Sequence, residues 1–155
     1  ALSVLTSNES TVMVYGSCTY VDQDNKVVWQ NRSGGFAAKI LRFGPCLIPQ
    51  PGALIKRKAF NEAGGLNEGL GWAFDLDLFI KLSKLGTLKY VGKNLASFRW
   101  HSDSLTVSLR RNSVKEASQV RVAHLYQVAR LLSFIWEPTI RFVTYHSQKL
   151  VRQQF

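Results

Sequence analysis

The sequence is poor in cysteine and has no long hydrophobic run. Its two cysteines, Cys18 and Cys46, lack the paired spacing and the nearby histidines of a zinc site. We therefore interpret both as reduced core residues of a cytosolic protein. No stretch reaches the roughly 18 apolar residues that a membrane-spanning helix needs, and no signal-peptide pattern is visible. These features predict a cytoplasmic protein, or one held peripherally at the inner face of the cell membrane.

Acidic residues are also scarce. The chain of 155 residues has 10 Asp and Glu against 20 Lys and Arg, which gives a formal net charge of +10. This excess favours an anionic partner, such as a phosphate-bearing substrate or a membrane surface, over an ordinary basic protein or a basic piece of a larger acidic one. Nucleic acid is not expected as a partner, because the sequence shows no basic helix and no interleaved aromatic platform. A hydrophobic content of 46% fits one folded domain with a core.

The order of the predicted elements is typical of an α/β body followed by helices. Hydrophobic periodicity and turn residues predict strands at 11–16, 26–29, 53–57, 88–91 and 95–100, and helices at 36–43, 58–63, 75–85 and 113–136, with a last helix to about 151. The first two strands form a hairpin, and Pro138 is expected to interrupt the C-terminal helix. We therefore expect an α/β body over residues 1–110 and a helical extension over 111–155.

Two carboxylates, Asp75 and Asp77, lie at the start of a predicted helix. At about 100° per residue, Asp75 falls on the apolar side with Leu78 and Leu82. Asp77 falls on the opposite side with Lys81. A carboxylate at the edge of an apolar face costs free energy unless it is paired or used. We therefore predict a solvated ion pair for Asp77, and for Asp75 either a general base or a helix N-cap.

Three more positions are typical of substrate or metal contacts. Trp72 follows two loop glycines, and it either stacks on a sugar face or fills the core. Arg99 and His101 fall on one face of a strand end. They suit a diphosphate or a metal there, or serve as a surface cation and a capping histidine. Asp22 and Asp24 have the spacing of a metal site, but they fall in the predicted hairpin turn, where Asp is favoured anyway.

The long predicted helix at 113–136 has one broad apolar face. Arg121 falls near the middle of that face, so it needs an anionic partner or must extend to solvent. Ser113 and Glu116 have the spacing of a capping box at the start of the helix. The apolar face either packs on the body or on a second copy of the chain, or docks on a membrane surface with the help of later basic residues.

Four segments, in sequence order, resemble the second half of a family 2 glycosyltransferase with the GT-A fold. They are PQPGALIKRKAF (49–60), EAGGLNEGL (62–70), DLDLFIKL (75–82) and ASFRWHSDSLT (96–106). Bacterial members of that family typically carry a basic pair before Gly-Gly, then an Asp-x-Asp-Leu helix, then an Arg-x-His strand end. The resemblance covers about residues 1–110, and it implies a partial GT-A mixed sheet with helices.

The resemblance implies transfer of a sugar from a nucleotide-diphospho-sugar donor to a glycan, polysaccharide or lipid-linked acceptor. It implies that Asp75 deprotonates the acceptor hydroxyl, and that a divalent cation, Mg²⁺ or Mn²⁺, takes part with His101 as a ligand. The residues that it implies for substrate binding are Gln50, Trp72, Phe74, Asp77 and Arg99. Relatives often carry Glu at the position of Phe74. The donor-binding half would precede Ala1, so we expect no transferase activity from this chain alone.

A second hypothesis is a non-enzymatic basic module. Such a module would bind a membrane surface or a protein partner, including a second copy of the chain, through its C-terminal helices. Replacing Asp75 by Asn in a longer protein that contains this chain distinguishes the two hypotheses, because unchanged turnover favours the module.

Overall fold

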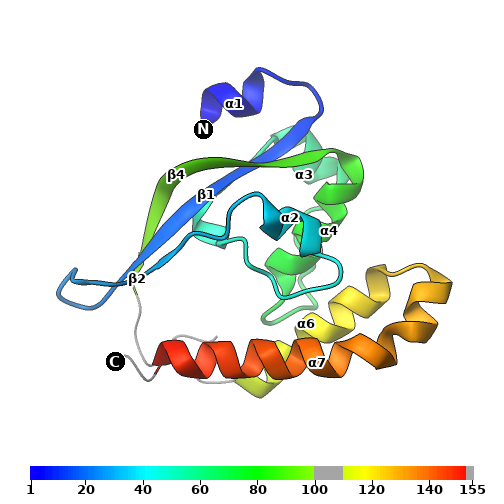
Figure 1. Ribbon diagram of the computed structural model, residues 1–155. Helices are drawn as coiled ribbons and strands as arrows, with labels where there is room; N and C mark the ends of the chain where they lie inside the picture. Colours follow the sequence, from blue (N-terminus) through cyan, green and yellow to red (C-terminus); the bar gives the residue numbers. More distant parts are fainter. Residues whose placement is uncertain (100–109, 153–155) are drawn as a thin grey trace.

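The fold is built around one central strand, β1 (Thr11–Val21). The computed structural model describes residues 1–99 and 110–152, with their side chains except at 110, 127, 128 and 147–152. In this part of the chain, β1 pairs with three further strands: β2 (Val27–Asn31), β3 (Ala53–Ile55) and β4 (Thr87–Arg99). β2 and β3 run antiparallel to β1 and share one of its edges, whereas β4 runs parallel along the other edge (Figure 1). The chain is therefore α/β, with an open, mixed sheet.

The sequence of β1 explains its central place. Residues Thr11 to Cys18 are all buried, and most of them are apolar. A strand that is apolar at successive positions, and not only at alternate ones, buries both of its faces. Tyr15 brings the largest of these side chains into the core, and its hydroxyl donates a hydrogen bond to the backbone oxygen of Gly34 over 2.9 Å.

Six α-helices and one short 3₁₀ turn belong to the described residues. They are α1 (Leu2–Thr6), α2 (Phe36–Ile40), η1 (Gln50–Gly52), α3 (Arg57–Glu62), α4 (Phe74–Leu85), α6 (Arg110–His124) and α7 (Gln127–Arg152). The helix α4 contributes most to the core, because Leu76, Leu78, Phe79, Ile80 and Leu82 are all buried.

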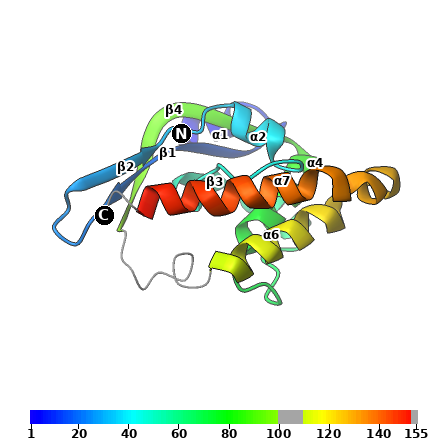
Figure 2. The ribbon, with the colours of Figure 1, turned by 60° about the horizontal axis from the view of Figure 1, so that its bottom comes forward.

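The helices α4, α6 and α7 lie below the sheet in the view of Figure 1, whereas α1 lies above it. α4 contacts β1 and β4 on one side and α6 on the other, and α7 packs against α6. Figures 1 and 2 show α6 and α7 next to each other, with α7 running along the outer side of the molecule. Val120 of α6 joins the main hydrophobic cluster, so the C-terminal helices share a core with the sheet.

Several expected elements are confirmed. The hairpin pairs Cys18 with Asn31 and Val21 with Val27, and its turn is closed by the Asp22 carboxylate, which accepts the backbone N–H groups of Asp24 and Lys26 at 2.9 Å. The short helix α2, the helical turn α3 and the end of α4 at Gly86 are also as expected. Gly86 fits this end because a Cβ there would collide with the backbone oxygen of Ser10.

Other expectations about the strands are wrong. The two strands expected at 88–91 and 95–100 form one strand, β4, in which Gly92 adopts φ 65° without ending the pairing. The strand expected at 53–57 ends at Ile55. Lys56 makes two hydrogen bonds at the start of β1: its backbone N–H donates to the carbonyl of Val12, and its ammonium group donates to the carbonyl of Asn8.

The C-terminal helices also differ from expectation. The first begins at Arg110 and ends at His124, so the break comes before residue 127 and not at Pro138. α7 continues through Pro138, which lies on its exposed side. Pro138 has no N–H to donate to the carbonyl of Phe134. Because this side of the helix is exposed, water can hydrate that carbonyl, and the helix tolerates the missing hydrogen bond.

Candidate functional site

The first turn of α4 carries the predicted acid, and it is held in place by α6. The loop before α4 leaves its backbone N–H groups without helical partners, as every helix start does. The carboxylate of Glu116 accepts three of them: Gly71 N–H at 3.1 Å, Trp72 N–H at 2.8 Å and Ala73 N–H at 2.7 Å. Burial raises the pKa of Glu116, but these three bonds outweigh it and leave the pKa lower than usual. Glu116 therefore fixes the loop as a charged acceptor.

Asp75 lies just inside the helix, at its second residue, and is half-buried. Its Oδ1 accepts the backbone N–H of Leu76 over 2.7 Å. Among the described residues, no ion pair involves Asp75. Burial raises its pKa, and the hydrogen bond to the backbone opposes that rise only in part. The N-cap position itself belongs to Ala73, but Asp75 lies in the first turn and accepts a free backbone N–H there, which is the structural role that the alternative interpretation expected.

The described groups that interact electrostatically with Asp75 include Tyr20 and Cys46. Burial first, and then the charges of Cys18, Cys46 and Asp75, raise the pKa of Tyr20 to about 12. Burial and the negative charge of Asp75 also raise the pKa of the Cys46 thiol. Both neighbours therefore stay neutral at pH 7, and Asp75 is the group among them that ionises. A carboxylate with a raised pKa and no ion pair in the described part of the chain is suited to accept a proton from a hydroxyl group.

Asp77 has a different setting. It is 6% exposed and lies under the end of α6. Its carboxylate binds Lys81 Nζ at 2.7 Å and His124 Nε2 at 2.7 Å, and His124 Nδ1 lies 3.1 Å from Lys84 Nζ. Burial raises the pKa of Asp77, but the bonds and charges of Lys81 and His124 outweigh it and lower the pKa. The expected pairing with Lys81 is confirmed, whereas the expected solvation is wrong because α6 covers this side of α4.

The other predicted residues are spread over the molecule. Trp72 and Phe74 lie beside Asp75 in the chain, and the indole Nε1 of Trp72 is buried without a hydrogen-bond partner in the described part. Gln50 is exposed on η1, a turn that contacts β1 and β4. His101 lies outside the described residues. Trp72, Phe74 and Asp75 thus lie in one segment at the start of α4, whereas Gln50 lies on a separate element.

Arg99 lies at the far end of β4, where it holds the hairpin turn. Its Nη1 donates to the carbonyls of Asp22 at 3.0 Å and Gln23 at 2.7 Å, and its Nη2 donates to Asn25 Oδ1 at 2.9 Å. These bonds favour its interpretation as a surface cation with a structural role. The turn interpretation of Asp22 and Asp24 is confirmed.

The described residues do not form a cluster of side chains that could coordinate a metal ion. No group of three or more His, Cys, Asp and Glu among them could hold one. Asp22, one of the two carboxylates with metal spacing, instead accepts backbone N–H groups of its own turn. Asp75 alone provides at most one ligand, so no step of the chemistry is derived through a cation.

Three residues important to this region were missed or misread in the sequence. Glu116 was expected to cap its own helix and caps α4 instead. His124 was not singled out, and no local pattern points to it. Glu137 is the anionic partner that Arg121 was expected to need. It could have been found, because residues 110–155 contain just two acidic residues, Glu116 and Glu137.

Comparison with known proteins adds no family to this picture. No model of a known protein family matches the chain, and no curated protein matches it. The class of protein is therefore argued from the residues and their geometry.

Proposed function

We propose that this chain is the acceptor side of a glycosyltransferase similar to family 2, with Asp75 as the base that activates the acceptor hydroxyl. The observation that carries the proposal is the setting of Asp75, a half-buried carboxylate with a raised pKa and no ion pair among the described residues. The segment that contains it also resembles the Asp-x-Asp-Leu helix of that family. An α/β chain with a mixed sheet is compatible with a partial GT-A fold.

The chemistry follows from the needs of sugar transfer. A sugar hydroxyl is a weak nucleophile, and a positioned carboxylate that takes its proton strengthens it. The acceptor oxygen then forms a bond to the anomeric carbon of the donor sugar while the bond from that carbon to the nucleoside diphosphate breaks. The proton moves to Asp75, and the electron pair leaves with the diphosphate.

Trp72 and Phe74 are proposed to contact the acceptor. Trp72 lies in the loop that Glu116 holds, so its position relative to α4 is fixed. Its buried Nε1 has no partner among the described residues, and a buried donor without a partner costs free energy. The side chain as a whole is partly exposed, and its ring is the part on which a bound sugar would stack. Gln50, Asp77 and Arg99 stay weaker candidates for substrate binding, because the last two are engaged in bonds within the chain.

The test uses a longer protein that contains this chain together with a donor-binding half. Asp75→Asn is expected to lower kcat by a factor of about 100 or more, since general bases typically contribute factors of 10²–10⁴. Asp24→Asn, an exposed carboxylate in the hairpin turn, is the matched control and is expected to retain full activity. Transfer is measured with labelled nucleotide-sugars, and unchanged turnover of Asp75→Asn would contradict the proposal.

The chain by itself gives a second test. We expect the purified 155-residue chain to transfer no sugar from any nucleotide-sugar donor, because the donor site would lie elsewhere. Sugar transfer by the purified chain would contradict the proposal that the chain holds only the acceptor side.

The alternative of a non-enzymatic module has one observation in its favour, the large apolar surface that α7 exposes. Full turnover of Asp75→Asn would favour this module, whereas loss of turnover would favour the enzyme. The surface of α7 does not by itself decide between them, since an enzyme can carry a docking helix.

A further inference from the structure

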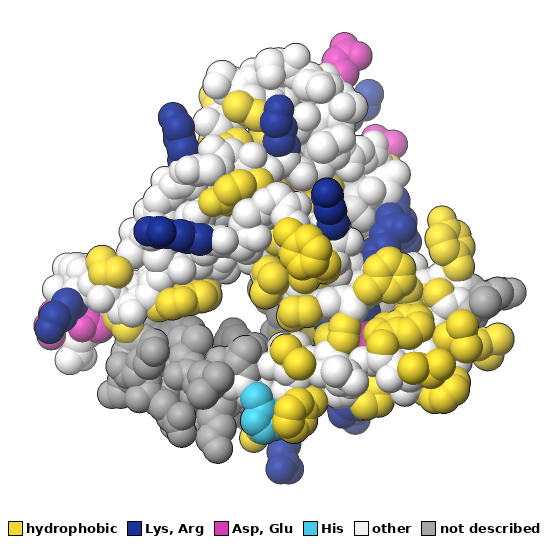
Figure 3. Space-filling view, viewed as in Figure 1, with side chains coloured by type: hydrophobic (Ala, Val, Ile, Leu, Met, Phe, Trp, Pro, Cys, Tyr) yellow, Lys and Arg dark blue, Asp and Glu magenta, His cyan; other side chains and the backbone are white. Residues whose placement is uncertain are grey.

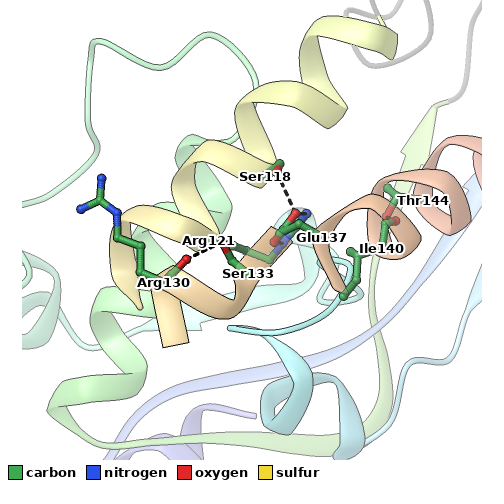
Figure 4. A network of polar contacts seen from close by, with 7 residues as sticks. All are labelled: Ser118, Arg121, Arg130, Ser133, Glu137, Ile140 and Thr144. Carbon is green, nitrogen blue, oxygen red and sulfur yellow. Dashed lines mark hydrogen bonds and ion pairs between the residues drawn. The ribbon is translucent and has the colours of Figure 1, made fainter. Parts of the chain in front are cut away.

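The helix α7 turns its polar side toward the rest of the protein. Ser133 and Glu137 are buried. The Glu137 carboxylate accepts two bonds from the Arg121 guanidinium, at 2.7 and 2.9 Å, and one from the Ser118 hydroxyl at 2.7 Å. Figure 4 shows Ser118 and Arg121 of α6 pointing toward Glu137 of α7. The contact between the two helices is therefore centred on a buried ion pair.

The opposite side of α7 is apolar and faces outward. Leu131, Phe134, Ile135 and Phe142 are between 61% and 75% exposed. At about 100° per residue, Leu131, Ile135 and Phe142 share the face opposite Ser133 and Glu137, and the exposed Phe134 lies on the flank of that face. Figure 3 shows hydrophobic side chains gathered over the part of the molecule where α7 lies. Further exposed apolar residues on or beside this helix are Tyr126, Leu132 and Val143.

This arrangement is the reverse of an ordinary surface helix. Such a helix buries its apolar stripe and exposes its polar side. Contiguous exposed apolar patches on soluble proteins usually mark a site of interaction. α7 therefore has an outward face that needs an apolar partner.

The charges around this face indicate what that partner is. Residues 110–155 contain eight Lys and Arg but just two acidic residues, Glu116 and Glu137. Both carboxylates are engaged with groups inside the protein. Arg130 and Arg141 are exposed on the flank of the apolar face, and Figure 4 shows Arg130 pointing away from the buried network. The described part of α7 thus presents apolar side chains and cations to the outside, with no exposed carboxylate.

A partner with an apolar interior and an anionic outer layer matches these features. A lipid bilayer with anionic headgroups has this character, and basic side chains are attracted to it. A second copy of the chain matches less well, because it would bring another cationic flank and no exposed carboxylate to the contact. No helix among the described residues combines the length and apolarity needed to cross a bilayer.

We propose that α7 lies flat in the headgroup region of an anionic membrane, with Leu131, Phe134, Ile135 and Phe142 inserted and Arg130 and Arg141 at the phosphate level. The buried Arg121–Glu137 pair holds the helix to the protein in this orientation. The proposal is independent of the role of Asp75, because it concerns a different surface.

The test measures binding of the purified 155-residue chain to sedimented vesicles. One set of vesicles is phosphatidylcholine, and the other is an equal mixture of phosphatidylcholine and phosphatidylglycerol. We expect binding to the mixture and much weaker binding to phosphatidylcholine alone. The variant Phe134→Ser/Phe142→Ser is expected to bind the mixture at least about tenfold more weakly, because it lacks the two aromatic rings whose transfer from water into the membrane favours binding. Arg130→Gln/Arg141→Gln is expected to lose about tenfold as well, and to show a smaller dependence on salt.

The matched control is Leu2→Ser, which removes an exposed leucine from α1, far from α7 in Figure 1, and is expected to bind as the original chain does. Circular dichroism checks that each variant keeps its fold, and a tube without vesicles corrects for aggregation. Three results would each overturn the proposal: no binding to the anionic mixture, equal binding to both kinds of vesicle, or undiminished binding of Phe134→Ser/Phe142→Ser. A dimer seen by sedimentation equilibrium without lipid, and broken by that same variant, would also overturn it in favour of a second copy.

Discussion

Two carboxylates two residues apart in the first turn of α4 have opposite effects on the folded state. Burial raises the pKa of Asp75, so its charged form is less favourable in the folded than in the unfolded chain. Asp77 is buried as well, but Lys81 and His124 lower its pKa, so its charged form is more favourable in the folded chain. The free energy of unfolding thus falls with rising pH on account of Asp75 and rises on account of Asp77. Functional sites often lower the stability of the folded state, because selection acts on activity there.

This contrast gives a prediction for the two Asn variants. At neutral pH, Asp75→Asn is expected to raise the free energy of unfolding or leave it unchanged, because a disfavoured charge is removed. Asp77→Asn is expected to lower it by about 1.5–3 kcal/mol, the range for hydrogen bonds to a charged group. Urea unfolding at pH 7 measures both.

Acid provides the control for this prediction. As the pH falls through the lowered pKa of Asp77, its contribution to stability is lost, so Asp77→Asn and the original chain should converge. Asp75→Asn should converge with the original chain once the pH is below the ordinary value of an aspartate. A similar loss of stability in both variants at pH 7 would contradict the assigned environments, and Asp24→Asn controls for the general effect of removing an exposed charge.

For single residues, the sequence predicted which ion pairs form better than it predicted which side chains are buried. The spacing of Asp77 and Lys81 was enough to predict their ion pair, because that contact is local to one helix. Burial of Asp77 depends on His124 and the end of α6, which is far along the chain. The need of Arg121 for an anion was likewise predicted from the helical wheel, whereas its partner Glu137 depends on how two helices meet.

At the scale of the elements, Glu116 joins α6 to the loop before α4. Glu116→Ala would leave the N–H groups of Gly71, Trp72 and Ala73 without their acceptor, and it is expected to lower the free energy of unfolding by about 1–2 kcal/mol. Amide hydrogen exchange of these three residues is expected to become faster, while exchange in β1 changes little. Glu116→Gln keeps an acceptor oxygen and should have the smaller effect. Unchanged exchange in Glu116→Ala would contradict the capping role.

The ion pair between α6 and α7 leads to another prediction. Arg121 is 1% exposed, so Glu137→Ala would leave its charge buried without a partner. The expected loss is about 3–5 kcal/mol, whereas replacing both residues by apolar ones, as in Arg121→Met/Glu137→Leu, is expected to be nearly neutral. Urea unfolding of the single and double variants measures the coupling between them. Additive losses in the double variant would contradict a direct buried pair.

Element positions were predicted where local signals are strong. The hairpin turn at Asp22–Asn25 and the end of α4 at Gly86 each depend on a few adjacent residues. The expected break at Pro138 was wrong, because a proline on the exposed side of a helix leaves a carbonyl that water can reach. The division of β4 into two strands was also wrong, since pairing along β1 continues past Gly92 despite its irregular register.

For the whole molecule, the sequence predicted the α/β class but not the arrangement of the sheet. The alternation of strand and helix patterns was sufficient for the class. The pairing of β4 with β1, and of β2 and β3 with one shared edge, arises from contacts between distant segments that a single sequence does not reveal. Of the candidate site, the grouping of Trp72, Phe74 and Asp75 follows from their neighbouring places in the chain, and their role stays a prediction. The bonds of Arg99 to the hairpin turn depend on a contact between distant segments that the sequence does not reveal.

The parallel pairing of β1 with β4 also bears on how the chain reaches its folded state during synthesis. Thr11 pairs with Thr87, so β1 emerges from the ribosome long before its longest partner strand has been made. Until then, β1 can form the hairpin with β2 but keeps one apolar edge open, and an open strand edge invites pairing with other chains. A chain that stops after Gly86 is therefore expected to aggregate instead of folding, which light scattering and circular dichroism can measure. A soluble, folded 86-residue product would show that β4 is dispensable for the sheet.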